Sequence, residues 1–118
     1  HKQGNPYVDD EDVPENIRST AAPPLTEEEK LSGHLDEFFD KRWDWVLDEM
    51  IWTFSQHMED DWEEQYCSGE SNYLVIEGQL VNGPNHTFKV DNEGIKKHRK
   101  RMDNGRRLFA KYYESLWD

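Results

Sequence analysis

The sequence predicts a mainly helical α+β protein, in which two long packed helices are joined by a small β-hairpin. Residues 34–64 contain no glycine or proline, and their apolar side chains recur at the three- and four-residue steps of a helix. Residues 92–117 form a second amphipathic segment, and residues 73–90 combine β-forming side chains with turn residues. We expect an extended or flexible N-terminal arm over 1–25 and a single domain over 26–118.

The segment 34–64 is the predicted centre of the fold. It holds four of the five tryptophans. At about 100° per residue, its apolar side chains cover far more than half of the helix surface. Such a helix needs neighbours on at least two sides, so either the chain folds back twice or a second copy covers the rest. We therefore expect a homodimer. The side chains expected to contact a partner or the second copy are Phe38, Trp45, Trp52 and Trp62.

Arg42 and Glu49 fall within the apolar sector of this helix, seven residues apart. We interpret them as a buried or half-buried ion pair that fixes the helix register. An acid–base site is the alternative interpretation.

The arm before the helices is polar and contains four prolines and the acidic run Asp9–Asp12. Isolated apolar residues could pin it to the body or to a partner: Tyr7, Val13, Ile17 and Leu25. The spacing of Thr26 and Glu29 predicts a capping box, so a helix should begin at Glu27. This helix either runs past Gly33 or breaks there.

The predicted hairpin has strands at residues 73–81 and 86–90, with a turn at Asn82-Gly83-Pro84-Asn85. Asp91 or Asn92 should cap the last helix, which reads to about Trp117. Gly105 lowers helix propensity by roughly 1 kcal/mol, so it indicates either close helix packing or a kink.

Charge is segregated along a chain whose net charge is −12. Residues 1–64 hold 19 acidic and 5 basic side chains, whereas residues 65–118 hold 7 acidic and 9 basic ones. The overall sign argues against nonspecific nucleic-acid binding by the whole molecule. The last third leaves a local basic face, which could contact nucleic acid or an acidic partner: Lys96, Lys97, Arg99, Lys100, Arg101, Arg106 and Arg107. The alternative is that these side chains only offset the acids of this chain or of a second copy.

No motif in the sequence predicts a catalytic, cofactor-binding or metal site. The acids Glu37 and Asp40, followed by Asp61 and Glu64, resemble the paired motifs of all-α nucleotide pyrophosphohydrolases, which hold Mg²⁺ between helices. Here both pairs fall on one predicted helix, too far apart to share an ion. Cys67 is the single cysteine, which excludes an internal disulfide and fits a reducing compartment.

Two segments resemble small proteins of tailed bacteriophages. They are Arg42–Phe54, with its LDEMIWTF sequence, and Asn104–Asp118, which reads NGRRLFAKYYESLWD. The resemblance covers about half of the chain and carries no catalytic motif. It implies a viral protein inside the host cell whose core is built from these two helices.

Taken together, these observations predict a small accessory protein that acts by protein–protein contact without enzymatic activity. Binding to a host factor and mimicry of nucleic-acid charge are the two candidate mechanisms. Nucleic-acid binding is the alternative, and a Mg²⁺-dependent nucleotide hydrolase is a third hypothesis. No stretch approaches the 18 apolar residues of a membrane span, so we expect a protein of the (host) cytoplasm.

Overall fold

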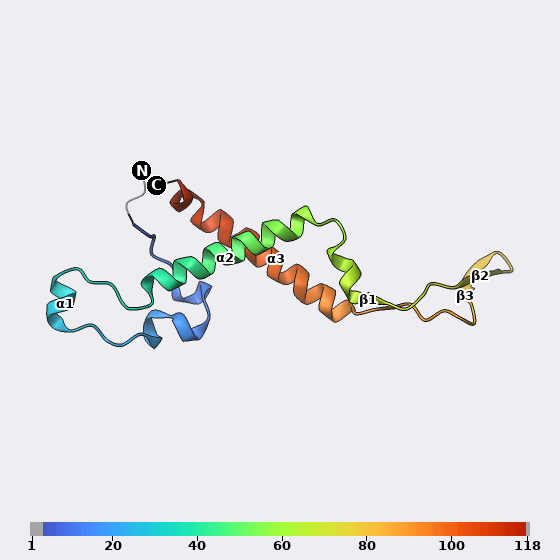
Figure 1. Cartoon of the computed structure of the whole chain (residues 1–118), viewed down its shortest axis with the longest axis horizontal. Coiled ribbons are helices and arrows are strands. Elements are labelled where there is room, and N and C mark those ends of the chain that lie inside the picture. Colours follow the sequence, from blue (N-terminus) through green and yellow to red (C-terminus); the bar gives the residue numbers. More distant parts are fainter. Residues whose placement is uncertain (1–3, 118) are drawn as a thin grey trace.

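Two crossing helices form the body of the protein in the computed structural model, which describes residues 4–117 (Figure 1). They are α2 (Phe39–Met58) and α3 (Asn92–Tyr112), and α3 is followed by a 3-10 turn, η5 (Tyr113–Leu116). The molecule is elongated, with principal extents of 80 × 30 × 17 Å. The predicted mainly helical fold with a small strand pair between the two long helices is confirmed.

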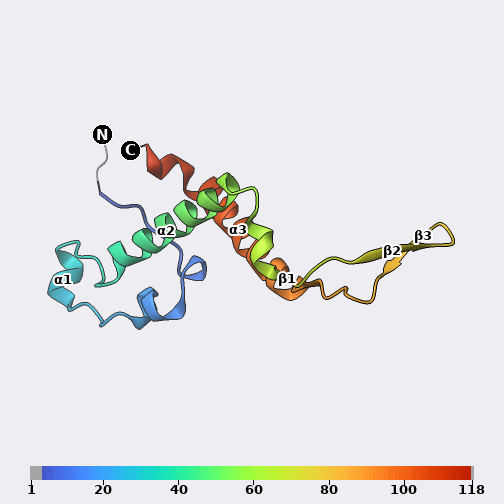
Figure 2. The same cartoon turned by 45° about the vertical axis from the view of Figure 1, so that its right-hand side comes forward.

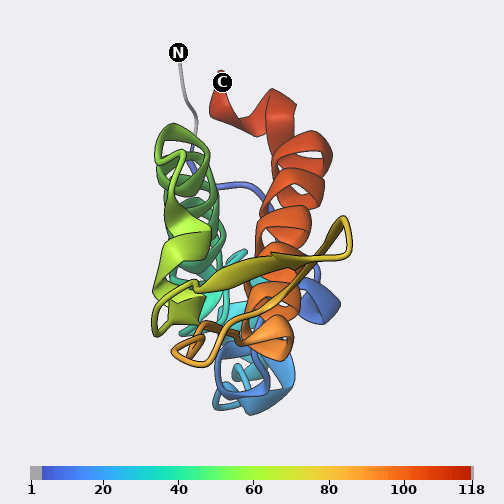
Figure 3. The ribbon, with the colours of Figure 1, turned by 90° about the vertical axis from the view of Figure 1, so that its right-hand side faces the viewer.

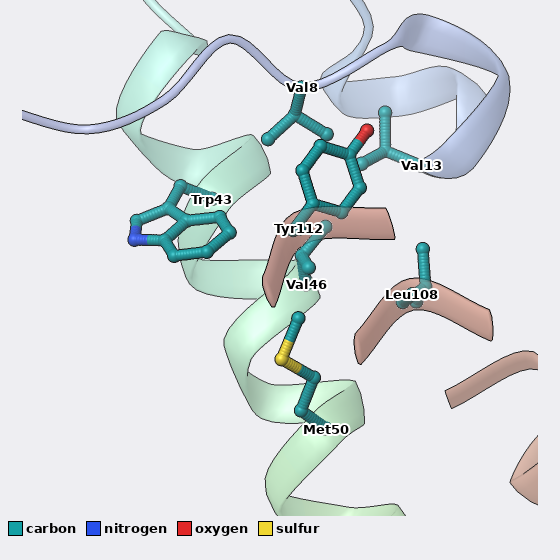
Figure 4. Packing of buried hydrophobic residues seen from close by; sticks show 7 residues of the cluster. All are labelled: Val8, Val13, Trp43, Val46, Met50, Leu108 and Tyr112. Carbon is teal, nitrogen blue, oxygen red and sulfur yellow. The ribbon is translucent and has the colours of Figure 1, made fainter. Parts of the chain in front are cut away.

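The core lies where the N-terminal arm crosses the helix pair. Trp43, Val46 and Met50 of α2 pack against Leu108 and Tyr112 of α3, and the ring of Trp43 meets that of Tyr112 edge-on (Figure 4). Two side chains of the arm, Val8 and Val13, complete this buried cluster. The two helices contribute only five side chains to this cluster, so the two valines of the arm supply part of the apolar surface that buries them.

Gly105 sits where the two helices cross. Its Cα faces Thr53, whose side chain is fully buried, and a Cβ built on Gly105 would lie 2.6 Å from the Cβ of Thr53. A side chain at this position would push α2 and α3 apart, so glycine permits the crossing. Of the two interpretations of this residue, close packing is confirmed.

The predicted helix over 34–64 is wrong at both ends. Asp36 accepts a hydrogen bond from the backbone N–H of Phe38, and this local turn holds the chain outside the helix until Phe39. At the other end the acids that begin at Glu59 meet the negative end of the helix dipole, which disfavours continuation. The chain instead turns back through the 3-10 segment η4 (Trp62–Tyr66) onto α3.

The arm and the first helix are short local structures. Three 3-10 turns, η1 (Asp10–Asp12), η2 (Glu15–Ile17) and η3 (Ser19–Ala21), precede α1 (Glu27–Leu31). The capping box of Thr26 and Glu29 is confirmed, with both hydrogen bonds present. The helix breaks at Gly33, whose φ of +77° lies in the left-handed region that favours glycine.

The chain between η4 and α3 forms one long antiparallel ribbon that projects beyond the helix pair (Figures 1 and 2). Near the body, β1 (Cys67–Ser68) pairs with β4 (Lys89–Val90); further out, β2 (Tyr73–Ile76) pairs with β3 (Gln79–Asn82). In the view from its tip, the ribbon points toward the viewer in front of the helix pair (Figure 3).

The turn of this ribbon is not where the sequence predicts it. Glu77 and Gly78 form a two-residue turn, and both have positive φ, 54° and 78°, as a type I′ hairpin turn requires. Part of the predicted segment 82–85 does form a turn, at Pro84-Asn85, where the N–H of His86 donates to the carbonyl of Gly83 (3.1 Å), but this turn lies between β3 and β4 and does not reverse the ribbon. There the N–H of Gly83 donates to the carbonyl of Asn72, which continues the pairing of the two strands.

Candidate functional site

An apolar groove runs along the helix pair on the side away from the arm. It has a volume of about 480 Å³ and is lined by Leu47, Met50, Ile51, Phe54, Ser55, Met58, Phe109 and Leu116. Ile51 and Met58 are 66% and 86% exposed, which is unusual for side chains of this size and character. The groove therefore presents a large apolar surface to solvent.

Helical periodicity explains why the groove and the arm use different faces. On α3 the buried stripe runs through Leu108 and Tyr112. Arg107 and Lys111 flank it on the side where the arm lies, whereas Phe109 flanks it on the other. Aromatic rings continue along the groove side, since Phe109 meets both Phe54 and Tyr113 edge-on.

The ribbon is a second exposed apolar surface. Side chains alternate between its two faces, which places Leu74, Ile76 and Val81 on one face and Tyr73 with Val75 and Leu80 on the other. Tyr73 through Ile76 and Leu80 are all 46–71% exposed. A hairpin in water normally has one polar face; this one is apolar on both.

The aromatic side chains predicted to contact a partner are all half-buried against the chain itself. Trp45 packs against the core cluster, and Phe38 lies under the ammonium of Lys41. Trp52 lies 3.8 Å beneath the guanidinium of Arg101, and Trp62 stacks on His98. The more exposed apolar surface lies on the ribbon and along the groove.

Four of the seven predicted contact cations form ion pairs with the protein's own acids: Arg99 with Glu63 (3.1 Å), Arg101 with Glu49 (2.7 Å), Arg106 with Asp103, and Arg107 with Asp12 (2.8 Å). The other three, Lys96, Lys97 and Lys100, have no ion pair within residues 4–117. The predicted pair between Arg42 and Glu49 is wrong, because Arg42 binds Asp36 at 2.6 Å and Glu49 binds Arg101.

Asp12 anchors the acidic arm to α3. Asp12 is 6% exposed, and its carboxylate accepts hydrogen bonds from Arg107 (2.8 Å), Lys111 (2.6 Å) and the hydroxyl of Tyr112 (2.7 Å). Burial pushes the pKa of Asp12 upward, but these three donors outweigh it and hold the pKa below 3.8. The sequence did not predict this role, because Asp12 is one of four consecutive acids. The neighbouring Val13, an isolated apolar residue in a polar arm, was the local sign that this part of the arm packs against the body.

His98 joins η4 to both long helices. With its proton on Nε2, the ring donates to Gln56 Oε1 (2.9 Å) and accepts at Nδ1 from the hydroxyl of Tyr66 (2.8 Å). It also stacks on Trp62 at a centroid distance of 4.2 Å. Burial, and then the charge of Arg101, lower the pKa of His98. His98 is therefore a packed and hydrogen-bonded residue.

Mild acid should weaken this junction. Because the folded-state pKa of His98 lies below its unfolded value, near 6.5, the unfolded chain gains the proton first and stability falls as the pH drops below about 6.5. We expect the urea midpoint to fall from pH 7.5 to pH 5.5 more in the wild type than in His98→Gln. The exposed His34 gives the control, His34→Gln, which should behave as the wild type. An equal fall in His98→Gln would assign the effect to other groups.

The paired acids do not come together. Glu37 and Asp40 lie near the start of α2, whereas Asp61 and Glu64 lie beyond its end. The 20 residues of α2 separate them by about 30 Å. Within residues 4–117 no group of three or more histidine, cysteine or acidic side chains could hold a metal ion.

The fold and these surfaces define a helical protein whose most prominent features, among the described residues, are exposed apolar surfaces. Among residues 4–117, no helix is both long and apolar enough to cross a membrane. No family model matches the chain, and no curated protein or solved structure is significantly similar to it.

Proposed function

We propose that the protein is a small, non-enzymatic accessory protein that acts by protein–protein contact, and that it works as a homodimer held together by its ribbon. The observation that carries this proposal is the ribbon with two exposed apolar faces. Isolated two-stranded hairpins are marginal in water, and exposed apolar patches in soluble proteins mark interaction sites. The resemblance to proteins of tailed bacteriophages supports a phage-type protein.

Charge favours a second copy as the partner of the ribbon. Two copies of a chain with a net charge of −12 repel each other across most of their surfaces. Residues 71–88 contain one charged side chain, Glu77, and it lies at the tip. Two ribbons can therefore approach without the repulsion that opposes contact between the acidic bodies.

Hydrogen bonding favours the same partner. β2 and β3 pair only with each other among the described strands, so each leaves an unpaired outer edge. An exposed edge is a template for another strand. The uncharged segment Tyr73–Ile76 can pair with its own copy in an antiparallel arrangement, which would give a four-stranded sheet.

Contact with nucleic acid is less well supported. Four of the seven cations on the basic face are already ion-paired within the chain, so phosphates would have to compete with carboxylates. The three remaining lysines, Lys96, Lys97 and Lys100, would have to act against a net charge of −12.

Polar substitution on the ribbon should abolish the dimer. We expect light scattering after size exclusion to show a dimer for the wild type and a monomer for Val75→Ser/Leu80→Ser, which removes apolar surface from one face of the ribbon. Leu31→Ser is the matched control, because Leu31 is 89% exposed on α1 and should leave the dimer intact. A dimer that persists in the double variant would show that another surface forms it, and a monomeric wild type would refute the proposal.

A further inference from the structure

We propose that the groove between α2 and α3 binds an amphipathic helix from a different protein, one whose apolar stripe is flanked by basic residues. This goes beyond self-association, because it assigns a second surface to a partner of different chemistry. The ribbon and the groove are separate in the chain, so one proposal can fail without the other.

The walls of the groove determine that its occupant is helical. Both walls are helices, whose backbone N–H and C=O groups are paired within the helix. Ser55 supplies the one side-chain hydroxyl in the lining, and it already donates to the carbonyl of Trp52 at 2.7 Å. An extended peptide would lose hydration of its backbone here and find no partner, whereas a helix satisfies its own backbone.

The length of the groove fits a short helix. Its lining on α2 runs from Leu47 to Met58, a distance of about 16 Å along the helix axis. An occupant of about three turns would match this length and place apolar side chains at every third or fourth position against Ile51 and Phe54.

The acidic side chains beside the groove favour an occupant with basic residues beside its apolar stripe. Asp44 and Asp48 lie on the same ridge of α2 as Ile51 and Ser55, at steps of three and four residues. Both are exposed, and neither has an ion pair within the described part of the chain. Lysine or arginine beside the apolar stripe of the occupant would face these carboxylates, whereas a second copy of this chain would bring its own acids to the same place.

Three synthetic peptides of about 18 residues test the inference on the 118-residue chain. Two of them share one stripe of leucines and differ only in flanking the stripe with lysine or with glutamate. The third keeps the lysines and replaces the leucines with serine. We expect fluorescence anisotropy to show binding of the lysine–leucine peptide at least about tenfold tighter than of the other two. Comparable binding of the glutamate–leucine peptide would refute the basic flank, and comparable binding of the lysine–serine peptide would refute the apolar groove.

Variants of the protein show where the lysine–leucine peptide binds. Ile51→Ser/Met58→Ser should weaken the lysine–leucine peptide by about tenfold or more, because it removes two exposed anchors. Asp44→Asn/Asp48→Asn should reduce the preference for lysine over glutamate. Leu31→Ser should change neither, and Val75→Ser/Leu80→Ser should retain peptide binding even as a monomer. If Ile51→Ser/Met58→Ser binds as the wild type does, or turns a dimer into a monomer, the groove is not a site for a foreign helix.

Discussion

Replacing Gly105 with alanine is expected to destabilise the protein by about 2 kcal/mol. Overpacking a filled site costs about 1–3 kcal/mol, and here the new methyl group would meet the buried side chain of Thr53 at the point where α2 and α3 cross. The helices cannot separate locally without opening the adjoining core cluster, to which Val46 and Leu108 belong. Urea unfolding followed by circular dichroism gives the difference.

Whether Gly105→Ala lowers or raises the free energy of unfolding distinguishes close helix packing from helix propensity alone. Helix propensity alone would make Gly105→Ala stabilising by about 1 kcal/mol. The exposed position Ala110 on the same helix provides the comparison, since Ala110→Gly should cost about that amount and nothing more. A stabilised Gly105→Ala variant would contradict the close crossing of the two helices.

Replacing Asp12 with asparagine is expected to cost about 2 kcal/mol at neutral pH. Hydrogen bonds to a charged group contribute about 1.5–3 kcal/mol, and Asp12 receives three of them while almost fully buried. We place the cost near the lower end because Arg107 and Lys111 are partly exposed and therefore partly hydrated. Glu11→Gln removes the same charge from the neighbouring, exposed carboxylate and should change stability little.

The pH dependence of this difference provides a second test. Because the pKa of Asp12 is lower in the folded protein than in the unfolded chain, its contribution is present above pH 4 and is lost as the pH falls through the folded-state pKa. The gap in urea midpoint between wild type and Asp12→Asn should therefore narrow below about pH 4. A gap that stays constant to pH 2 would contradict a charged Asp12 in the folded state.

Local signals in the sequence were reliable where short-range physics decides the structure. The capping box at Thr26 and Glu29 and the cap at Asp91 each depend on residues only a few positions apart. The two main helices were predictable because their apolar periodicity extends over many turns.

The errors arose where long-range contacts override local patterns. Asn82-Gly83 is the stronger local signal for a hairpin turn, yet the register of the whole ribbon places the reversal at Glu77-Gly78. Arg42 and Glu49 looked like partners because they share a helix face. Their actual partners are Asp36, in the loop before the helix, and Arg101, on another helix.

Charge patterning alone gave an incomplete view of the candidate sites. The run of basic residues on α3 looked like a binding face, but its acidic partners, such as Asp12 and Glu49, lie far away in the sequence. The exposed groove could not be predicted, because helical periodicity identifies apolar side chains without showing which of them the rest of the chain leaves uncovered.

The central claim is that two copies meet through their ribbons, and a distance between spin labels tests it most directly. The label is placed at the tip in a Cys67→Ser/Glu77→Cys variant, which leaves one cysteine per chain. Four-residue strands span about 13 Å, so paired ribbons should hold their tips within about 30 Å of each other. Pulsed electron paramagnetic resonance should resolve such a distance. A dimer whose tips lie beyond about 50 Å, or no interchain distance at all, would contradict the account.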